Sequence, residues 1–146
     1  MISFCRIKSL TSKQEEEVKN LYRDAGWWFA SDEKKLEMIA RIVAGSWIFC
    51  IAIKNDEILA IGRVISDGVS DAYIQDITVR SDSRKQGIGT ALVEFIIRKL
   101  TEEGFSWIGL IATPESERIY KRIGFKEMTN NKAMILRFRS APGQDC

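Results

Sequence analysis

Histidine is absent from this chain of 146 residues. Its absence excludes His-based catalytic triads and removes the commonest metal ligand of proteins. Cysteine is scarce as well: Cys5, Cys50 and Cys146 are an odd number, and their spacing does not match a metal site. Cys5 and Cys50 stand inside apolar runs, so we expect small core residues there and no metal cofactor.

Long apolar runs and a strong charge of one sign are missing too. No apolar stretch reaches the roughly 20 residues that cross a bilayer, and Met1–Arg6 lacks the apolar core of a signal peptide. The formal net charge is only +2, and basic residues alternate with acidic ones. We therefore expect a chain of the cytoplasm that binds neither nucleic acid nor a membrane.

The length and composition suit one folded domain. The chain is 45% apolar and 29% charged, which is ordinary for a globular protein. A domain of this size buries roughly two-thirds of its unfolded surface. The two prolines, Pro114 and Pro142, do not mark a linker. We expect one domain over residues 1–139 and a loose C-terminal tail at 140–146.

Hydrophobic periodicity and turn residues divide the domain into alternating elements. Helices are predicted over about 12–24, 32–44, 87–103 and 115–122. Strands are predicted at 2–8, 47–54, 57–66, 71–80, 105–112 and 133–138, and one more short strand is left open near 125–128. Antiparallel strands followed by a β-α-β crossover predict an α/β (α+β) fold: a mixed, mostly antiparallel sheet of six or seven strands with helices on both faces.

The segment Arg84–Gly89 reads R-K-Q-G-I-G and opens the third predicted helix. The first N–H groups of a helix have no internal partner and lie at the positive end of its dipole, so they suit a phosphate. Glycine lets a ligand approach the backbone closely. Neither the Rossmann nor the P-loop pattern is present. Taken alone, the segment suits a flexible turn before a core helix equally well.

The surroundings of this turn resemble motif A of the GNAT acetyltransferase superfamily. The resemblance rests on the strand Y-I-Q-D-I-T-V-R, the turn R-K-Q-G-I-G and the apolar helix T-A-L-V-E-F-I-I-R-K-L. Residues 120–125, Y-K-R-I-G-F, resemble the Y-x-x-x-G-F end of motif B. The predicted element order matches as well, so the resemblance covers most of the chain. It implies an acyltransferase that moves the acetyl group of acetyl-CoA directly to a primary amine.

The resemblance also implies where acetyl-CoA would bind. The pyrophosphate would lie on the turn amides, and the backbone of the preceding strand would pair with the pantetheine arm as an added strand does. Motif B often begins with Asn and Ala where this chain has Thr113 and Ser116, which shortens the reach to that arm. The implied cofactor contacts are Ile77, Thr78, Val79, Arg84, Lys85, Gln86, Gly87, Ile88, Gly89, Thr90, Thr113, Ser116 and Tyr120.

Two catalytic residues are expected, each with a structural alternative. Tyr120 matches the tyrosine that often protonates the departing thiolate, although a packed aromatic beside Phe125 is the other interpretation. Asp76 is predicted to take the amine proton through water, because no histidine is present. Asp76 could instead orient a neighbouring loop. Strand alternation places it opposite Tyr73 and Gln75, unless a bulge reverses the phase.

The acceptor amine is expected between the first two helices. Trp27 and Trp28 could form a lid that stacks on an aromatic amine, or could anchor the loop to the core. We expect Tyr73 and Gln75 to contact the acceptor as well. The pattern L-Y-x-x-x-G-W at residues 21–27 resembles GNAT proteins related to serotonin-type arylalkylamine acetyltransferases, which points to small aromatic amines.

Other acceptors and partners stay open. Asp24, Asp32 and Glu33 could receive a cationic amine, but each also suits a helix end. The acceptor could instead be a polyamine, an aminoglycoside, an amino acid or a protein α-amine, or the chain could be a non-catalytic acetyl-CoA-binding module. The apolar run Met134–Leu136 could serve a homodimer, although an interior strand would have the same composition.

Overall fold

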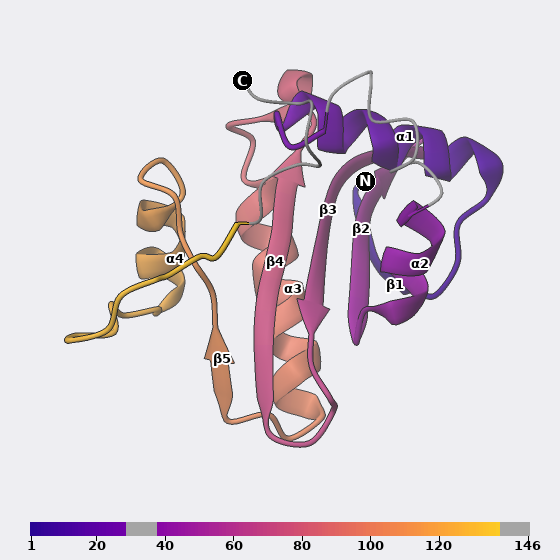
Figure 1. Ribbon diagram of the computed structural model, residues 1–146. Helices are drawn as coiled ribbons and strands as arrows, with labels where there is room; N and C mark the ends of the chain where they lie inside the picture. Colours follow the sequence, from indigo (N-terminus) through magenta and orange to yellow (C-terminus); the bar gives the residue numbers. More distant parts are fainter. Residues whose placement is uncertain (29–37, 138–146) are drawn as a thin grey trace, which may run out of the picture.

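The computed structural model describes residues 1–28 and 38–137. A single five-stranded sheet forms its centre, and the strands lie side by side in chain order (Figure 1). The first four strands are antiparallel, and the fifth pairs in parallel with the fourth. The strands are β1 (Ser3–Ile7), β2 (Ile48–Lys54), β3 (Glu57–Ile65), β4 (Asp71–Val79) and β5 (Trp107–Gly109).

Helices cover both faces of this sheet. The helices are α1 (Ser12–Asp24), α2 (Met38–Gly45), α3 (Ile88–Glu102) and α4 (Glu117–Ile123). Helices α1 and α2 pack on one face, α3 packs on the other, and α4 lies beyond β5 (Figure 1). The predicted α/β class and helix order are confirmed.

Helix α1 forms because its start is capped and one face is apolar. The Thr11 hydroxyl accepts a hydrogen bond from the Gln14 N–H, and the Gln14 side chain accepts one from the Thr11 N–H. Such a reciprocal cap satisfies two otherwise unpaired donors and contributes about 1 kcal/mol. Val18, Leu21 and Tyr22 then face the sheet at helical spacing, each at most 3% exposed.

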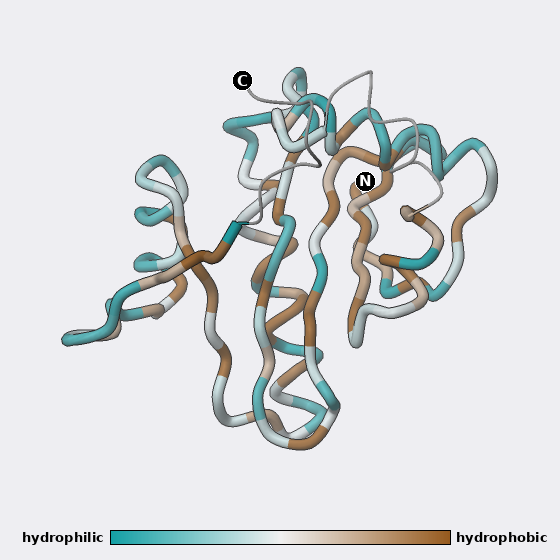
Figure 2. Tube along the Cα trace, in the orientation of Figure 1, coloured by the Kyte–Doolittle hydropathy of each residue, from teal (hydrophilic) through white to brown (hydrophobic). Residues whose placement is uncertain are grey.

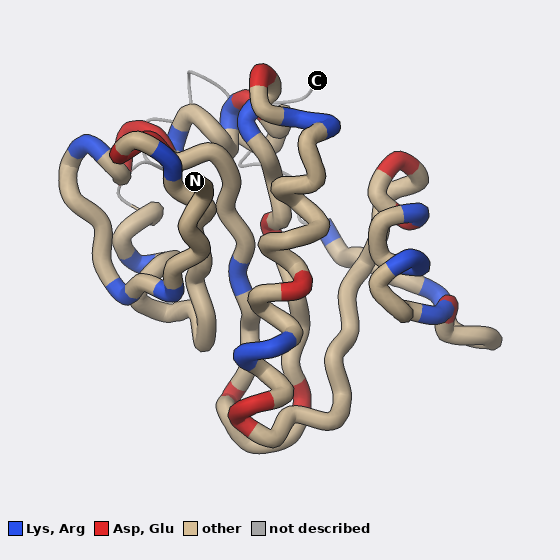
Figure 3. The backbone as a smooth tube through the Cα atoms, turned by 180° about the vertical axis from the view of Figure 1, so that it is seen from behind, with Lys and Arg blue, Asp and Glu red and all other residues tan. Residues whose placement is uncertain are grey.

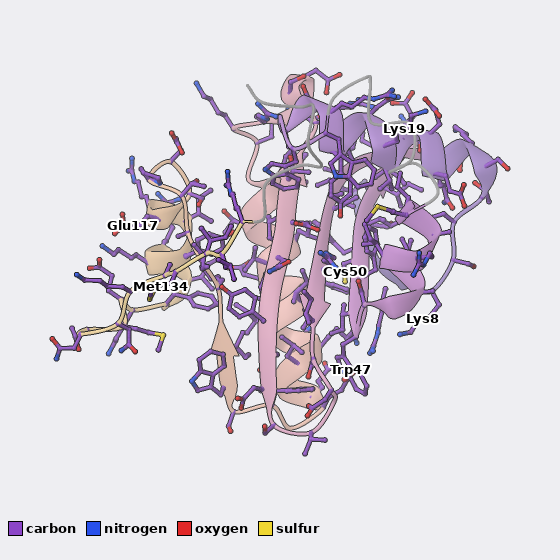
Figure 4. All side chains as sticks on the ribbon, viewed as in Figure 1. Lys8, Lys19, Trp47, Cys50, Glu117 and Met134 are labelled. Carbon is purple, nitrogen blue, oxygen red and sulfur yellow. The ribbon has the colours of Figure 1, made fainter. Side chains whose placement is uncertain are left out.

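The core consists of two apolar clusters, one on each side of the sheet. Hydrophobic residues recur along the strands and along α3 (Figure 2). On the α3 face, Leu92, Ile96 and Leu100 are fully buried against the strands. Burying a side chain of this size contributes about 1.5–3 kcal/mol. Cys50, labelled in Figure 4, belongs to this cluster, and burial raises the pKa of its thiol to about 12. The expectation that Cys50 is a core residue is confirmed.

Strand β4 contains one extra residue, and this bulge changes which side chains face which helix. Ile61 of β3 pairs with Thr78, but Arg63 pairs with Gln75, so Asp76 and Ile77 together stand opposite Gly62. Asp76 has φ +55°, in the left-handed region that L-residues rarely adopt. Ala72 and Ile74 lie in the α3-side cluster before the bulge, and Ile77 and Val79 pack on the same side after it. Strict alternation would have placed Ile77 and Val79 on the opposite face.

The prediction of six or seven strands is wrong for the described residues, which form five. Strand β5 has three residues instead of the eight expected at 105–112, and neither 125–128 nor 133–137 forms a strand. Met134, Ile135 and Leu136 have strand-like composition, but they are 75–92% exposed and pair with no strand of the described sheet. A strand needs a partner for its backbone hydrogen bonds, and β-propensity alone does not supply one. Residues 32–37 of the second predicted helix and the expected tail at 140–146 lie outside the described part of the chain.

Within residues 1–28 and 38–137, no helix combines the length and the apolar character that crossing a membrane requires.

Gly62→Ala tests the packing opposite the bulge. A methyl group there would press into Ile77 Cδ1 and lie 3.0 Å from Ile96 Cδ1. We expect overpacking to lower the free energy of unfolding by about 1–3 kcal/mol, measured by urea denaturation. Adding Ile77→Val removes the nearest atom and is expected to restore part of that loss. Additive losses in the double variant would contradict this packing.

Candidate active site

The turn between β4 and α3 exposes a row of backbone N–H groups. Ser81–Ser83 forms a short 3-10 turn, and Lys85 and Gly87 have φ of +61° and +79° before α3 begins at Ile88. Left-handed residues in a turn can aim successive N–H groups toward one side, a geometry that binds anions. No described residue accepts a hydrogen bond from the N–H groups of residues 86–90, and no side chain caps α3. These donors are free to bind water or a ligand.

Gly87 and Gly89 are required in the turn for different structural reasons. Gly87 has a left-handed backbone, and an added Cβ would meet nothing within 4 Å, so its conformation alone demands glycine. At Gly89, an added Cβ would lie 3.3 Å from Val79 Cγ2. Gly89 therefore lets the start of α3 approach the end of β4 closely.

The basic side chains of the turn have different surroundings. Arg84 donates from Nε to the Val79 carbonyl at 2.9 Å and from Nη2 to Asp24 Oδ2 at 3.3 Å. Its guanidinium is thus held against the end of β4 and the end of α1. Lys85 is exposed, next to the N–H groups of the turn. Lys85 is the turn residue whose charge is directly available to an anion.

Strands β4 and β5 pair over three residues and then separate (Figure 1). Asp71, Ala72 and Tyr73 pair with Trp107–Gly109, and from Ile74 to Val79 the β5-side edge of β4 has no strand beside it among the described residues. A cavity of about 620 Å³ lies between β4, β5, α4 and the segment that follows α4. The two strands therefore splay apart, which leaves backbone groups of Ile77–Val79 at an open edge.

Tyr73 and Tyr120 both line this cavity, with Trp107 and Phe125. The Tyr120 ring packs edge-on against Phe125, at 5.8 Å between centroids and 78° between planes. Burial raises the pKa of the Tyr120 phenol, so it stays protonated at neutral pH and can donate a proton. The packing on Phe125 is therefore present, and the role of Tyr120 as proton donor stays a prediction.

Thr113 and Ser116 are occupied with each other at the start of α4. The Thr113 N–H donates to Ser116 Oγ at 3.0 Å, their hydroxyl oxygens lie 3.0 Å apart, and the Ser116 hydroxyl donates to the Thr113 carbonyl. Glu117, the next residue, lies on α4 on the far side of β5 from the rest of the sheet (Figure 4). The two hydroxyls therefore stabilise the turn that leads into α4, and their predicted cofactor contact stays a prediction.

Asp76 lies in a polar cluster on the α1 face. Its Oδ2 accepts hydrogen bonds from the Tyr22 hydroxyl at 2.7 Å and from Arg63 Nε, and Arg63 Nη2 also donates to Gln75 Oε1 at 3.3 Å. The Arg63 and Asp76 side chains are 19% and 22% exposed. The bulge thus brings Gln75 and Asp76 to one side, contrary to simple alternation.

Burial and the negative charge of Asp76 raise the pKa of Tyr22, with burial the larger cause. Tyr22 is only 3% exposed and keeps its proton throughout the physiological range. It is therefore a permanent hydrogen-bond donor to Asp76.

Tyr22 also organises the two tryptophans that follow α1. Trp28 stacks on its ring with centroids 4.5 Å apart, and Trp27 meets it edge-on at 5.6 Å. Trp28 packs against the α1-side core, whereas Trp27 is 42% exposed. Trp28 has the contacts of the anchor, and Trp27 keeps surface for a ligand. Phe29, Asp32 and Glu33 lie outside the described residues.

Sequence reasoning missed Arg63 and Tyr22, and it left the role of Asp24 open. Arg63 was detectable as a single charge inside the apolar strand E-I-L-A-I-G-R-V-I, because a charge there needs a partner. The position of Tyr22 on the buried stripe of α1 gave no sign of its bond to Asp76. Asp24 binds the turn through Ser81 and Arg84, whereas the sequence left it open between an amine contact and a helix end.

We also examined the distribution of charged residues and of possible metal ligands in the described part of the chain. Seen from behind, Lys and Arg positions and Asp and Glu positions both occur along the backbone (Figure 3). No group of three or more His, Cys, Asp or Glu side chains within residues 1–28 and 38–137 could hold a metal ion.

Comparison with known families gives one match over most of the chain. The family model described as "Acetyltransferase (GNAT) domain" matches residues 9–134. An uncharacterized N-acetyltransferase ycf52 of Gracilaria tenuistipitata var. liui is 29% identical over 103 residues, which are 70% of this chain and 57% of that protein. The chain spans 57–64% of the length of the three ycf52 relatives.

A rice protein (Oryza sativa subsp. japonica) named serotonin N-acetyltransferase 2, chloroplastic, is 33% identical over 67 residues, which are 46% of this chain and 34% of that protein.

Solved structures show the same fold. A GNAT family acetyltransferase of Streptococcus pneumoniae superposes with a TM-score of 0.77 at 24% identity, over 96% of this chain and 100% of that one. A predicted acetyltransferase of Clostridium acetobutylicum, whose structure was solved with acetyl-CoA, superposes with a TM-score of 0.68 at 18% identity, over 92% and 96% of the two chains. At these identities the likeness shows the fold alone.

Tyr22→Phe tests the bond between Tyr22 and Asp76. Near pH 7 we expect the variant to be less stable by about 1–2 kcal/mol, because a buried hydrogen bond to a charged group is lost. The unfolded chain releases the Tyr22 proton near pH 10, whereas the folded chain retains it. The free energy of unfolding of the wild-type chain should therefore fall above about pH 10, and its difference from that of the variant should become smaller. Urea denaturation from pH 7 to 11 measures the free energy of unfolding of both chains. A difference between them that does not change with pH would contradict the hydrogen bond from Tyr22 to Asp76.

Proposed function

The chain belongs to the GNAT acetyltransferase family, and on that premise we propose that it is an N-acetyltransferase which moves the acetyl group of acetyl-CoA directly to a primary amine. The observation that carries the proposal is the continuity between the open edge of β4 and the turn. Backbone groups at Ile77–Val79 have no strand on the β5 side, and they lead directly to the free N–H groups of residues 86–90. An extended ligand that carries a phosphate could bind along the β4 edge and place its phosphate at these N–H groups.

The donor groups suit the parts of acetyl-CoA. The N–H groups of residues 86–90 and the Lys85 ammonium would hold the pyrophosphate, and the β4 edge would hold the amide-bearing pantetheine arm. Thr113 and Ser116 remain proposed contacts at the start of α4. When bound, acetyl-CoA supplies the activated thioester, and the chain supplies position and proton transfer.

Tyr120 is proposed as the general acid. Attack of the amine on the thioester carbon breaks the C–S bond, and the departing thiolate needs a proton. The phenol lies in the cavity beside β5, and burial keeps it neutral. A positioned proton donor of this kind accelerates a reaction by about 10²–10⁴-fold.

Asp76 is proposed to accept the amine proton through water. A lysine-like amine has a pKa near 10.4, so holding it neutral at pH 7 costs about 4–5 kcal/mol. Arg63 and Tyr22 fix the Asp76 carboxylate by two hydrogen bonds to Oδ2. The alternative role, in which Asp76 only orients its neighbours, draws support from the same two bonds.

The proposed acceptor is a small aromatic amine. Trp27 keeps 42% of its surface exposed and contacts Tyr22, whose hydroxyl reaches Asp76. An aromatic ring stacked on Trp27 would thus lie in the same cluster as the proposed base, with Tyr73 and Gln75 as further contacts. The name of the rice relative agrees with such a substrate, although the match spans 34% of that protein.

Two other outcomes are kept as alternatives. A soybean relative (Glycine max), 32% identical over 73 residues, is named histone acetyltransferase, so a protein amine is one alternative acceptor. A polyamine, an aminoglycoside or an amino acid is another alternative acceptor. The other outcome is that the chain is a non-catalytic acetyl-CoA-binding module. A cytoplasmic location and a homodimer through Met134–Leu136 remain predictions, and the rice relative's name places that protein in the chloroplast.

An amine panel tests the proposal. The chain is incubated with acetyl-CoA and with aromatic amines, polyamines, aminoglycosides, amino acids or peptides, and the released thiol is measured. We expect aromatic amines to accelerate release most, and acetyl-CoA at a hundred times its Kd to stabilise the fold by about 2.7 kcal/mol. Stabilisation without amine-dependent release would favour the non-catalytic module. If neither occurs, the proposed function is wrong.

Tyr120→Phe and Asp76→Asn separate the two proton transfers. Tyr120→Phe keeps the packing on Phe125 and removes only the hydroxyl, so we expect kcat to fall about 10²-fold with an unchanged Kd for acetyl-CoA. Asp76→Asn should lower turnover chiefly at low pH, again with little change in that Kd. A pH–rate profile that Asp76→Asn leaves unchanged removes Asp76 from the role of base, and full activity of Tyr120→Phe leaves Tyr120 with packing alone.

A further inference from the structure

Asp24, the last residue of α1, joins that helix to the turn before α3. Its Oδ2 accepts a hydrogen bond from the Ser81 N–H at 2.8 Å and pairs with Arg84 Nη2 at 3.3 Å. Ser81 and Arg84 follow Asp24 in the chain by 57 and 60 residues, respectively. One carboxylate thus holds both the first residue of the 3-10 turn and the basic residue that follows it.

The helix end alone does not account for Asp24. The C-terminus of a helix carries partial negative charge, so an acidic residue there is unfavourable in isolation. Here the Arg84 guanidinium and the Ser81 N–H supply compensating positive charge. The carboxylate is therefore stabilised by the turn, and the turn is restrained by the carboxylate.

Restraint of Ser81 and Arg84 bears on the residues that follow. Arg84 also donates to the Val79 carbonyl, so the end of β4, the 3-10 turn and Asp24 form one connected unit. Lys85 and Gly87, with their left-handed backbones, come directly after it. A left-handed Lys costs about 1–2 kcal/mol relative to an ordinary conformation, so its geometry must be imposed by neighbours.

We propose that Asp24 is a positioning residue that preorganises the N–H groups of residues 86–90 for the pyrophosphate of acetyl-CoA. The inference rests on the proposed function for the identity of the ligand. Asp24 itself does not contact the ligand: it acts through Ser81 and Arg84. A preorganised turn loses less freedom on binding, so the contribution of Asp24 appears in cofactor affinity and not in the chemical step.

Asp24→Asn is the main variant, because the amide oxygen can still accept from the Ser81 N–H while the charge facing Arg84 is lost. We expect the Kd and KM for acetyl-CoA to rise about threefold to tenfold, with kcat at saturating acetyl-CoA unchanged. Asp24→Ala loses both contacts and should show a larger rise. Hydrogen exchange of the Ser81 and Ser83 amides without ligand should quicken in both variants, because both N–H groups are hydrogen-bonded in the turn.

Two further variants make the test specific. Asp56→Asn removes an exposed carboxylate that pairs with Lys13 near the other end of α1, and we expect it to leave the Kd for acetyl-CoA unchanged. Arg84→Gln should raise that Kd as Asp24→Asn does, and the double variant should add little, because both substitutions break one unit.

The outcomes separate this inference from the proposed function. If wild-type chain binds acetyl-CoA, and Asp24→Asn binds it equally well with unchanged exchange of the Ser81 and Ser83 amides, the role of Asp24 is refuted and the proposed function stands. If Asp24→Asn lowers kcat and leaves the Kd unchanged, Asp24 is not a positioning residue for the turn. If wild-type chain fails to bind acetyl-CoA, both are overturned together.

Discussion

The left-handed bulge at Asp76 is the constraint on which both the core and the candidate site depend. A single extra residue in β4 shifts the phase of every side chain that follows it. Ile77 and Val79 can then pack on the α3 side, and Asp76 reaches Tyr22 and Arg63 on the α1 side. A non-glycine residue in this conformation costs about 1–2 kcal/mol. Two hydrogen bonds to Asp76 and the burial of Ile77 offset that cost.

Among the described residues, strand β4 has an unpaired edge because β5 pairs with only its first three residues. Strand β5 pairs with β4 over only three residues, and the chain then diverges toward α4. The free edge of β4 and the turn before α3 are consecutive, so one ligand can use backbone donors and acceptors of both. Gly89 allows this continuity because it brings α3 within contact of Val79.

Local sequence signals predicted much of the fold. Helix α1 was expected over about 12–24 and is found at Ser12–Asp24, because its cap and its apolar stripe are both local. Pairing across the chain was harder to predict. The apolar run Met134–Leu136 has the composition of a strand, but composition does not say whether a partner strand lies beside it. For that reason the strand count was too high.

Sequence signals for the candidate site are clearest where they are consecutive in the chain. Short motifs single out the turn at Arg84–Gly89 and Tyr120, whose roles stay predictions. The ion pair of Arg63 with Asp76 and the contact of Asp24 with Ser81 join distant segments. Such contacts depend on register and on the bulge, and a sequence pattern indicates at most that a buried charge needs a partner.

Hydrogen exchange with and without acetyl-CoA tests the central claim most directly, because the account assigns the ligand to named backbone amides. We expect acetyl-CoA to slow exchange at residues 77–79 and 86–90 and to leave β1 and β2 unchanged. Protection confined to other segments, or none at saturating acetyl-CoA, would contradict the claim that the β4 edge and the following turn form the cofactor site.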